Sequence, residues 1–185
     1  MIMRKSIIVV DNFYNNPDEV REFALSVEYK SDLRFYKGLR SVENYQQDGL
    51  KEVFEELIGE KIVSFPDKDS FNGCFQITTA EDPQVYHHDT QKWAAMIYLT
   101  PNAPFESGTR THSSKINFTR HMNDENAQDA FSSGYYDSTK FNTVDSIGNV
   151  YNRLVIMDAQ HFHSAGSYFG QDKETGRLTH LFFFD

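Results

Sequence analysis

Cysteine is almost absent from this sequence. Cys74 is the only one among 185 residues, so no internal disulfide can form, and the composition fits a reducing compartment. Long apolar runs are missing as well. The stretch 7–10 is the only apolar run near the start, too short for a signal peptide, and nothing downstream approaches the length of a membrane-spanning helix. These absences predict a soluble protein in the cytoplasm.

Positive charge is also in short supply. The chain has 18 Lys and Arg against 27 Asp and Glu, a formal net charge of −9. A nucleic acid or an anionic membrane surface would require a basic patch, so neither is expected as a partner. Repeats, linkers and low-complexity tracts are absent too, which indicates one domain over residues 1–185. The chain's 16 Phe and 10 Tyr supply material for a sizeable core.

The first 60 residues predict a strand and two scaffold helices. Residues 6–10 are rich in β-branched side chains and predict the strand. Asn16 and Pro17 are typical of a helix start, and apolar residues follow at helical spacing. Asp48 can cap a second helix, which Gly59 ends. Neither helix carries residues that point to chemistry.

From residue 61 onward the pattern changes to short strands separated by turn residues. Many short strands with this punctuation favour a sandwich or a barrel-like jelly roll. The fold class is therefore α+β, with an antiparallel core over residues 61–185 that is interrupted by a polar insertion at 117–148. The expected strands are 61–65, 71–79, 84–89, 93–99, 153–158, 166–169 and 177–184.

The segment Val85-Tyr86-His87-His88-Asp89 carries the first chemical signal. Side chains alternate along an extended chain, so His87 and Asp89 point to one face and His88 to the other. An imidazole and a carboxylate side by side form two-thirds of a facial metal triad of two histidines and one carboxylate, the set that suits non-haem Fe(II). The pattern is short, so its weight depends on a second histidine elsewhere.

Two downstream stretches complete the constellation. The apolar strand at 153–158 runs into a loop that holds His161 and His163, which flank Phe162 and would share a face if extended. Either histidine could complete the triad on this pattern alone. Arg177 and Thr179 then open the last strand on one shared face.

Together these stretches resemble the Fe(II)/2-oxoglutarate-dependent dioxygenases, and most closely their prolyl-hydroxylase-like branch. In that branch a strand of the type Arg-Leu-Val-Ile, present here at 153–156, precedes the distal histidine. A final strand with Arg, a hydroxyl residue two positions later and an aromatic tail closes the core, as residues 177–185 do. The resemblance covers 71–185 without the insertion, and it implies a double-stranded β-helix. It also favours His163 over His161, because Ser164-Ala165-Gly166 is similar to the turn that follows the family's distal histidine.

The resemblance implies a role for each residue. His87, Asp89 and His163 would be the catalytic metal ligands for Fe(II), and Arg177 with Thr179 would bind the far carboxylate of 2-oxoglutarate. The guanidinium fork of arginine suits that carboxylate because it donates two parallel hydrogen bonds. O2 would be the oxidant and ascorbate a candidate reductant. The expected reaction is hydroxylation with decarboxylation of 2-oxoglutarate to succinate, since family members that halogenate lack the carboxylate ligand.

Other interpretations stay open beside this one. A cupin-like metal-binding protein, such as an isomerase or a sensor, would share the barrel and some ligands without oxygenase activity, and a binding module would need no metal. Arg177 alone would suit a surface ion pair with Asp172 or Glu174. The remaining histidines and the cysteine are expected to have structural places: His88 outside the triad, His112 and His121 solvated, and His180 and Cys74 packed.

The substrate is not specified by these residues. The family branch acts on prolyl residues in peptides and on small molecules, so a small-molecule or peptide substrate is expected. Loops carry specificity more often than strands do. The segments 30–45, predicted to be an ordered loop, and 117–148 are expected to border the substrate pocket. The second contains Tyr135 and Tyr136 and is a candidate lid.

Overall fold

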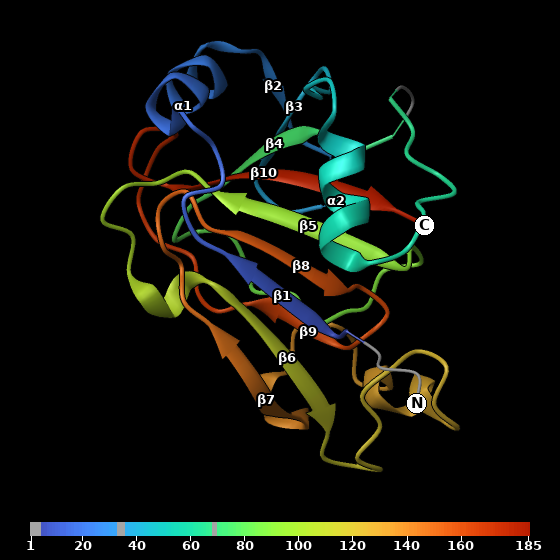
Figure 1. The fold of residues 1–185 in the computed structure, drawn as a ribbon. Helices are drawn as coiled ribbons and strands as arrows, with labels where there is room; N and C mark the ends of the chain where they lie inside the picture. Colours follow the sequence, from blue (N-terminus) through green and yellow to red (C-terminus); the bar gives the residue numbers. More distant parts are fainter. Residues whose placement is uncertain (1–4, 33–35, 68–69) are drawn as a thin grey trace.

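The structure, a computed structural model, describes residues 5–32, 36–67 and 70–185. Two antiparallel sheets face each other, one of seven strands in the order β1-β8-β5-β10-β4-β3-β2 and one of three in the order β7-β6-β9 (Figure 1). This is the α+β double-stranded β-helix. Its strands are β1 (Ile7–Val10), β2 (Tyr29–Lys30), β3 (Leu39–Ser41), β4 (Cys74–Thr78), β5 (Trp93–Tyr98), β6 (Thr109–Ser114), β7 (Phe141–Ile147), β8 (Leu154–Asp158), β9 (His163–Ala165) and β10 (Arg177–Phe184).

Both predicted helices are present and cover the outer face of the large sheet (Figure 1). In α2 (Leu50–Ile58) three residues, each four positions after the last, are buried against the sheet: Leu50, Phe54 and Ile58. The residue before α2 is Gly49 in a left-handed conformation, so the prediction that Asp48 caps this helix is wrong. In α1 (Pro17–Ser26) the proline occupies the first turn as expected, while Asn16 makes no side-chain capping bond.

Alternation along β10 separates the two sides of the large sheet. Leu178, Phe182 and Phe184 pack toward the helices. Leu181 and Phe183 face the opposite way, into the space between the sheets. A strand with one face on the helices and one between the sheets is buried along nearly its whole length, which explains why its last four residues are all apolar.

Three of the predicted strands are wrong. Residues 61–65 form no strand; the backbone N–H groups of Val63 and Ser64 donate to the carbonyl of Asp185, and the carbonyl of Ser64 accepts from the N–H of Asp185. Residues 166–169 form none either, and the strand in this region is β9, a few residues earlier. The segment 84–89 is extended but makes only one bridge, between His87 and His163.

Strands also occur where loops were predicted. The insertion 117–148 contains two short 3-10 turns, η2 (Ala127–Phe131) and η3 (Ser138–Lys140), and ends in β7; a third turn, η1 (Phe105–Ser107), precedes β6. The loop predicted at 30–45 contains β3 and touches β2, while its residues 33–35 lie outside the described part of the chain. Residues 1–60 therefore contribute three of the seven strands of the large sheet.

Candidate metal centre

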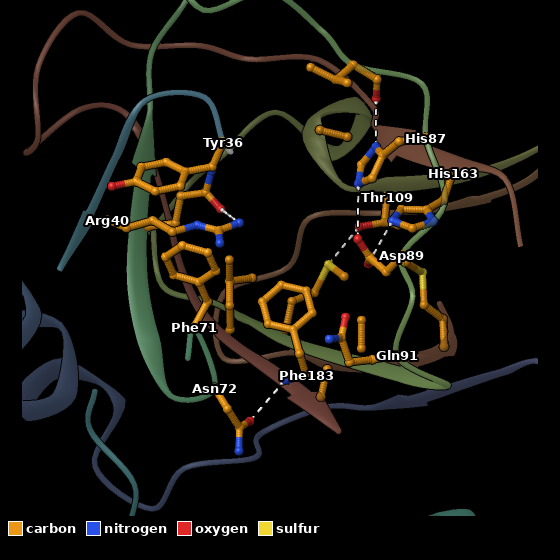
Figure 2. Close-up of a pocket in the computed structure, with 18 of the residues that line it drawn as sticks. Tyr36, Arg40, Phe71, Asn72, His87, Asp89, Gln91, Thr109, His163 and Phe183 are labelled. Atoms are coloured by element: carbon orange, nitrogen blue, oxygen red, sulfur yellow. Dashed lines mark hydrogen bonds and ion pairs between the residues drawn. The ribbon is translucent and has the colours of Figure 1, made fainter. Parts of the chain in front are cut away.

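His87, Asp89 and His163 converge at one end of the space between the sheets (Figure 2). One ligand atom from each lies within 4.8 Å of the others. His87 Nε2 is 3.8 Å from Asp89 Oδ1, and His163 Nε2 is 3.5 Å from Asp89 Oδ2. The main chain sets this arrangement, because the His87 and His163 backbones exchange hydrogen bonds of 3.0 and 2.8 Å. Asp89 is held in turn by its own N–H, which donates to the carbonyl of Ala159.

Hydrogen bonds at the far side of each ring determine which nitrogen is available to a metal. Nδ1 of His163 lies 2.8 Å from the carbonyl of His161, and Nδ1 of His87 lies 3.3 Å from that of Val85. A carbonyl can only accept, so each Nδ1 carries the hydrogen and each neutral ring presents an Nε2 lone pair. Two lone pairs therefore face one carboxylate. This donor set suits a divalent cation.

Burial supports the neutral form of the more enclosed histidine. His163 is nearly inaccessible to solvent. Burial, with the nearby His87 as a second cause, lowers the pKa of His163 to about 4. The imidazole is thus uncharged near neutral pH, as metal ligation requires.

A second cluster of the same composition lies nearby, and its members are His121, Asp158 and His161. His121 Nε2 is 3.4 Å from Asp158 Oδ1, and His161 Nδ1 is 3.8 Å from Asp158 Oδ2. His121 and His161 also form a backbone bridge of their own. The prediction that His121 is solvated is wrong, because only 7% of it is exposed.

The same reasoning about protons separates the two clusters. The backbone N–H of Asn123 donates to Nδ1 of His121 at 3.1 Å. Nδ1 is then an acceptor, so in a neutral ring the hydrogen is on Nε2, which faces the carboxylate of Asp158. The two atoms are 3.4 Å apart, so this pair can interact without a metal. Of the two histidines left open by the sequence, His163 lies with His87 and Asp89, whereas His161 lies in the second cluster.

The other histidines have structural places. His88 points away from the candidate metal centre, toward Phe131 and Phe162. His112 was expected to be solvated, but it is buried beside Ser164, and burial lowers its pKa to about 4. His180 is buried and lies 2.8 Å from the hydroxyl of Tyr14.

Arg177 lines the same cavity as the three candidate ligands. It is 6% exposed, so it is not a surface residue, and among the described residues no ion pair joins it to Asp172 or Glu174. Its Nε donates to the carbonyl of Ser107 at 2.8 Å, and Nη2 lies 3.4 Å from that of Gly108. These bonds fix a charged guanidinium inside the protein.

Three further residues lie close to Arg177 or on its strand: Thr179, Tyr98 and Thr109. Thr179 is fully buried and lies 3.5 Å from the carbonyl of Gln76, but it does not line the cavity, so its part in cosubstrate binding stays a prediction. The sequence pattern did not indicate that Tyr98 and Thr109 belong to the site. The Arg177 guanidinium lies 5.3 Å from the centre of the Tyr98 ring, and the Tyr98 hydroxyl is hydrogen bonded to Thr109 at 2.8 Å.

The cavity has a volume of about 670 Å³ and runs from the candidate metal centre to the loops at its mouth. Small-molecule sites typically have volumes of about 300–1,000 Å³. Both loops expected to border a substrate pocket reach it, one through Tyr36, Lys37 and Arg40 and the other through Tyr135 and Tyr136. Lys37 lies over the ring of Tyr136 at 5.4 Å, so the two loops meet across the mouth.

A third apolar cluster holds the insertion in place. Its buried members are Tyr86, Ala127, Ala130, Phe141 and Phe162, and Phe131 packs against them. This packing fixes the first part of the insertion. The lid prediction therefore applies to the segment around Tyr135 and Tyr136, which are 53% and 56% exposed.

Comparison with known proteins places this geometry in context. The model of the family described as "Family of unknown function (DUF6445)" matches residues 2–184. No curated protein matches the sequence. Among the described residues, no helix has the length and apolarity needed to cross a membrane.

Several solved structures share the fold. A prolyl hydroxylase from Trichoplax adhaerens, in complex with a peptide fragment of the hypoxia inducible factor oxygen degradation domain, has a TM-score of 0.57 at 12% identity, covering 97% of this chain and 84% of that one. HygX from Streptomyces hygroscopicus, with nickel, 2-oxoglutarate and hygromycin B bound, has a TM-score of 0.63 at 9% identity, covering 95% and 81%. A Pseudomonas putida prolyl-4-hydroxylase has a TM-score of 0.52 at 13% identity, covering 97% and 91%. At these identities the likeness establishes the fold.

Proposed function

We propose that this chain, which belongs to the DUF6445 family, is an Fe(II)- and 2-oxoglutarate-dependent oxygenase that hydroxylates a substrate not yet identified. One observation carries the proposal. The Nε2 lone pairs of His87 and His163 face the carboxylate of Asp89 in a cavity that also holds the buried guanidinium of Arg177. The first three residues suit a divalent metal with open coordination positions, and the fourth suits an anion. The fold shared with 2-oxoglutarate-binding HygX supports this combination.

The chain's residues have separate tasks in this proposal. When bound, Fe(II) and 2-oxoglutarate supply an oxidation in which O2 converts 2-oxoglutarate to succinate and CO2 and a substrate C–H to C–OH. His87, Asp89 and His163 hold the metal from one side and leave the cavity side open. Arg177 binds the distal carboxylate, with its orientation fixed by the carbonyls of the loop before β6.

Residues at the mouth of the cavity select the substrate in this proposal. The comparison proteins were solved with a peptide in one case and with hygromycin B in another. A peptide or a polar small molecule is therefore the substrate expected here. The loops carrying Lys37 and Tyr136 contact each other across the mouth, which supports a role for both in holding the substrate.

The second candidate function is a cupin-like metal protein without oxygenase activity, such as an isomerase or a sensor. The cluster of His87, Asp89 and His163 would serve such a protein as its metal site. Such a protein would have no use for the cationic end of the cavity at Arg177. The need for 2-oxoglutarate is therefore what separates the two functions.

The test is an anaerobic titration of the protein with Fe(II) and 2-oxoglutarate, followed by visible absorption. An oxygenase gives a weak charge-transfer band only when both are present. Asp89→Ala should abolish the band, and His161→Gln, the matched control in the second cluster, should keep it. Fe(II) binding with no response to 2-oxoglutarate would favour the second candidate. Absence of Fe(II) binding would contradict both.

A further inference from the structure

We propose that Arg40 forms an anion-binding subsite, in the cavity but away from the metal centre, that takes a carboxylate group of the substrate. Figure 2 shows Tyr36, Arg40 and Phe71 together on one side of the cavity, with His87, Asp89 and His163 on the other. As a statement about substrate, the inference rests on the proposed oxygenase. The binding of an anion at Arg40 can be measured without it.

Aromatic rings hold the Arg40 guanidinium in position. Its central carbon lies 4.6 Å from the ring centre of Tyr36, 4.5 Å from that of Phe71 and 5.6 Å from that of Phe183. Stacking uses the flat faces of a guanidinium and leaves its N–H groups at the edge. The group is therefore fixed in orientation while most of its donors stay available.

Few protein acceptors meet those donors. Among the described residues, the Arg40 side chain makes one hydrogen bond, of 3.4 Å, to Gln76 Oε1. Its buried Nε atom has no partner among them, and no carboxylate in this part of the chain forms an ion pair with this arginine. A buried donor without an acceptor is unfavourable, so an anion that reached this guanidinium would relieve an existing cost.

The neighbouring amide is also set in place. Gln76 Nε2 donates to the carbonyl of Lys37 at 2.8 Å, which turns Oε1 toward Arg40. Arg40 and Gln76 are paired across β3 and β4, and Gln76 pairs with Thr179 on β10, so all three lie in one row of the large sheet. Arg40 and Gln76 are thus held in place by sheet strands, while Tyr36 and Phe71 lie in the segments that precede β3 and β4.

Charge in the cavity agrees with an anionic ligand. Among the described residues its lining contains Lys37, Arg40 and Arg177 and two carboxylates, Asp89 and Asp185, in a chain whose net charge is −9. Arg177 already donates to two backbone carbonyls, which distinguishes it from Arg40. Arg40 and Arg177 are therefore two cationic groups with different surroundings, and each suits a different anionic group of the ligands.

The experiment compares binding of phenylacetate and phenylacetamide by ligand-observed NMR titration. The two probes are nearly the same shape, carry a ring that can lie against Phe71 and Phe183, and differ in charge. The parent should bind phenylacetate at least about tenfold more tightly, since charge-assisted hydrogen bonds are markedly stronger than neutral ones. Arg40→Gln should bring the ratio to about one, and Arg40→Lys should keep part of it. Arg110→Gln, on β6 and outside the cavity lining, is the matched control.

The titration is repeated with Mn(II) and 2-oxoglutarate at saturation, which occupies the candidate metal centre and Arg177. The preference for phenylacetate should persist. A ratio near one in the parent would overturn the subsite, as would a ratio that survives Arg40→Gln or disappears on Arg177→Gln. Circular dichroism of each variant establishes that the fold is intact. If the preference holds but the protein binds neither Mn(II) nor 2-oxoglutarate, the oxygenase fails and the anion subsite stands.

Discussion

Replacement of Arg177 tests the cosubstrate half of the site. If its guanidinium pairs with the distal carboxylate of 2-oxoglutarate, Arg177→Ala removes one partner of a buried charged pair, a loss of about 2–5 kcal/mol. At about 1.4 kcal/mol per factor of ten, the apparent Kd for 2-oxoglutarate should rise roughly 30-fold to several thousand-fold. Fe(II) affinity should change little, because Arg177 bonds to Ser107 and Gly108 and to none of the three candidate metal ligands.

The same contacts predict a cost in stability. Arg177→Ala leaves the buried carbonyl of Ser107 without its donor, which costs about 1–3 kcal/mol. Arg177→Lys is therefore the sharper variant. It keeps a charge and a donor near these carbonyls, but a single ammonium cannot reproduce the two parallel bonds of a guanidinium fork. We expect Arg177→Lys to regain most of the stability and little of the affinity for 2-oxoglutarate.

The assay is the anaerobic charge-transfer band, titrated with 2-oxoglutarate at saturating Fe(II), together with a separate Fe(II) titration. Thermal unfolding of each variant reports stability. Arg110→Gln again serves as the matched arginine replacement outside the cavity. If the alanine and lysine variants both bind 2-oxoglutarate like the parent, the assignment of Arg177 as the anchor is refuted.

Three further outcomes are expected. His163→Gln should reduce metal binding, measured as bound Fe(II) per chain, at least tenfold more than His161→Gln does, because of these two histidines His163 is the one that faces Asp89. Equal losses in the two variants would contradict this. Burial lowers the pKa of His180 to about 4 from its ordinary 6.5. On acidification the unfolded chain therefore binds a proton at this histidine before the folded protein does. The free energy of unfolding should fall as pH drops from about 6.5 to about 4. Denaturant titrations across this range should show a shallower fall in His180→Gln. Replacing Tyr135 and Tyr136 together by Ser should lower substrate hydroxylation more than substrate-free succinate formation, and an equal loss of both would count against the lid.

The predictable parts of the fold are those whose signal is local. Strand β10 is indicated by Arg177, by the hydroxyl residue two positions later and by its aromatic tail, and α2 is indicated by apolar residues at every fourth position. The pairing of His87 with Asp89 needed only the two-residue period of an extended chain. These features depend on residues that are close together in the sequence, so they can be predicted from the sequence alone.

The features that were missed depend on distant partners. Strand β7 is largely polar, with four consecutive exposed positions, and it is a strand because β6 supplies its hydrogen bonds. The assignment of His161 and His163 to different clusters follows from bridges to His121 and His87, which lie 40 and 76 positions earlier in the chain. The setting of Arg40 requires three aromatic rings from separate segments. The pattern within a single segment does not predict contacts between segments that are distant in the sequence.

The reciprocal backbone bonds between His87 and His163 have a consequence for how the metal centre can vary. Main-chain atoms set the spacing of these two positions, and main-chain atoms are the same whatever the side chain. The scaffold therefore specifies where two donors stand and leaves their chemical identity open. Exchanging either histidine for cysteine or aspartate should change which metal is preferred, with softer donors favouring softer ions, while the position of the site in the barrel stays fixed. The backbone bridge thus sets the position of the site, and the side chains at these two positions set the preference for one metal.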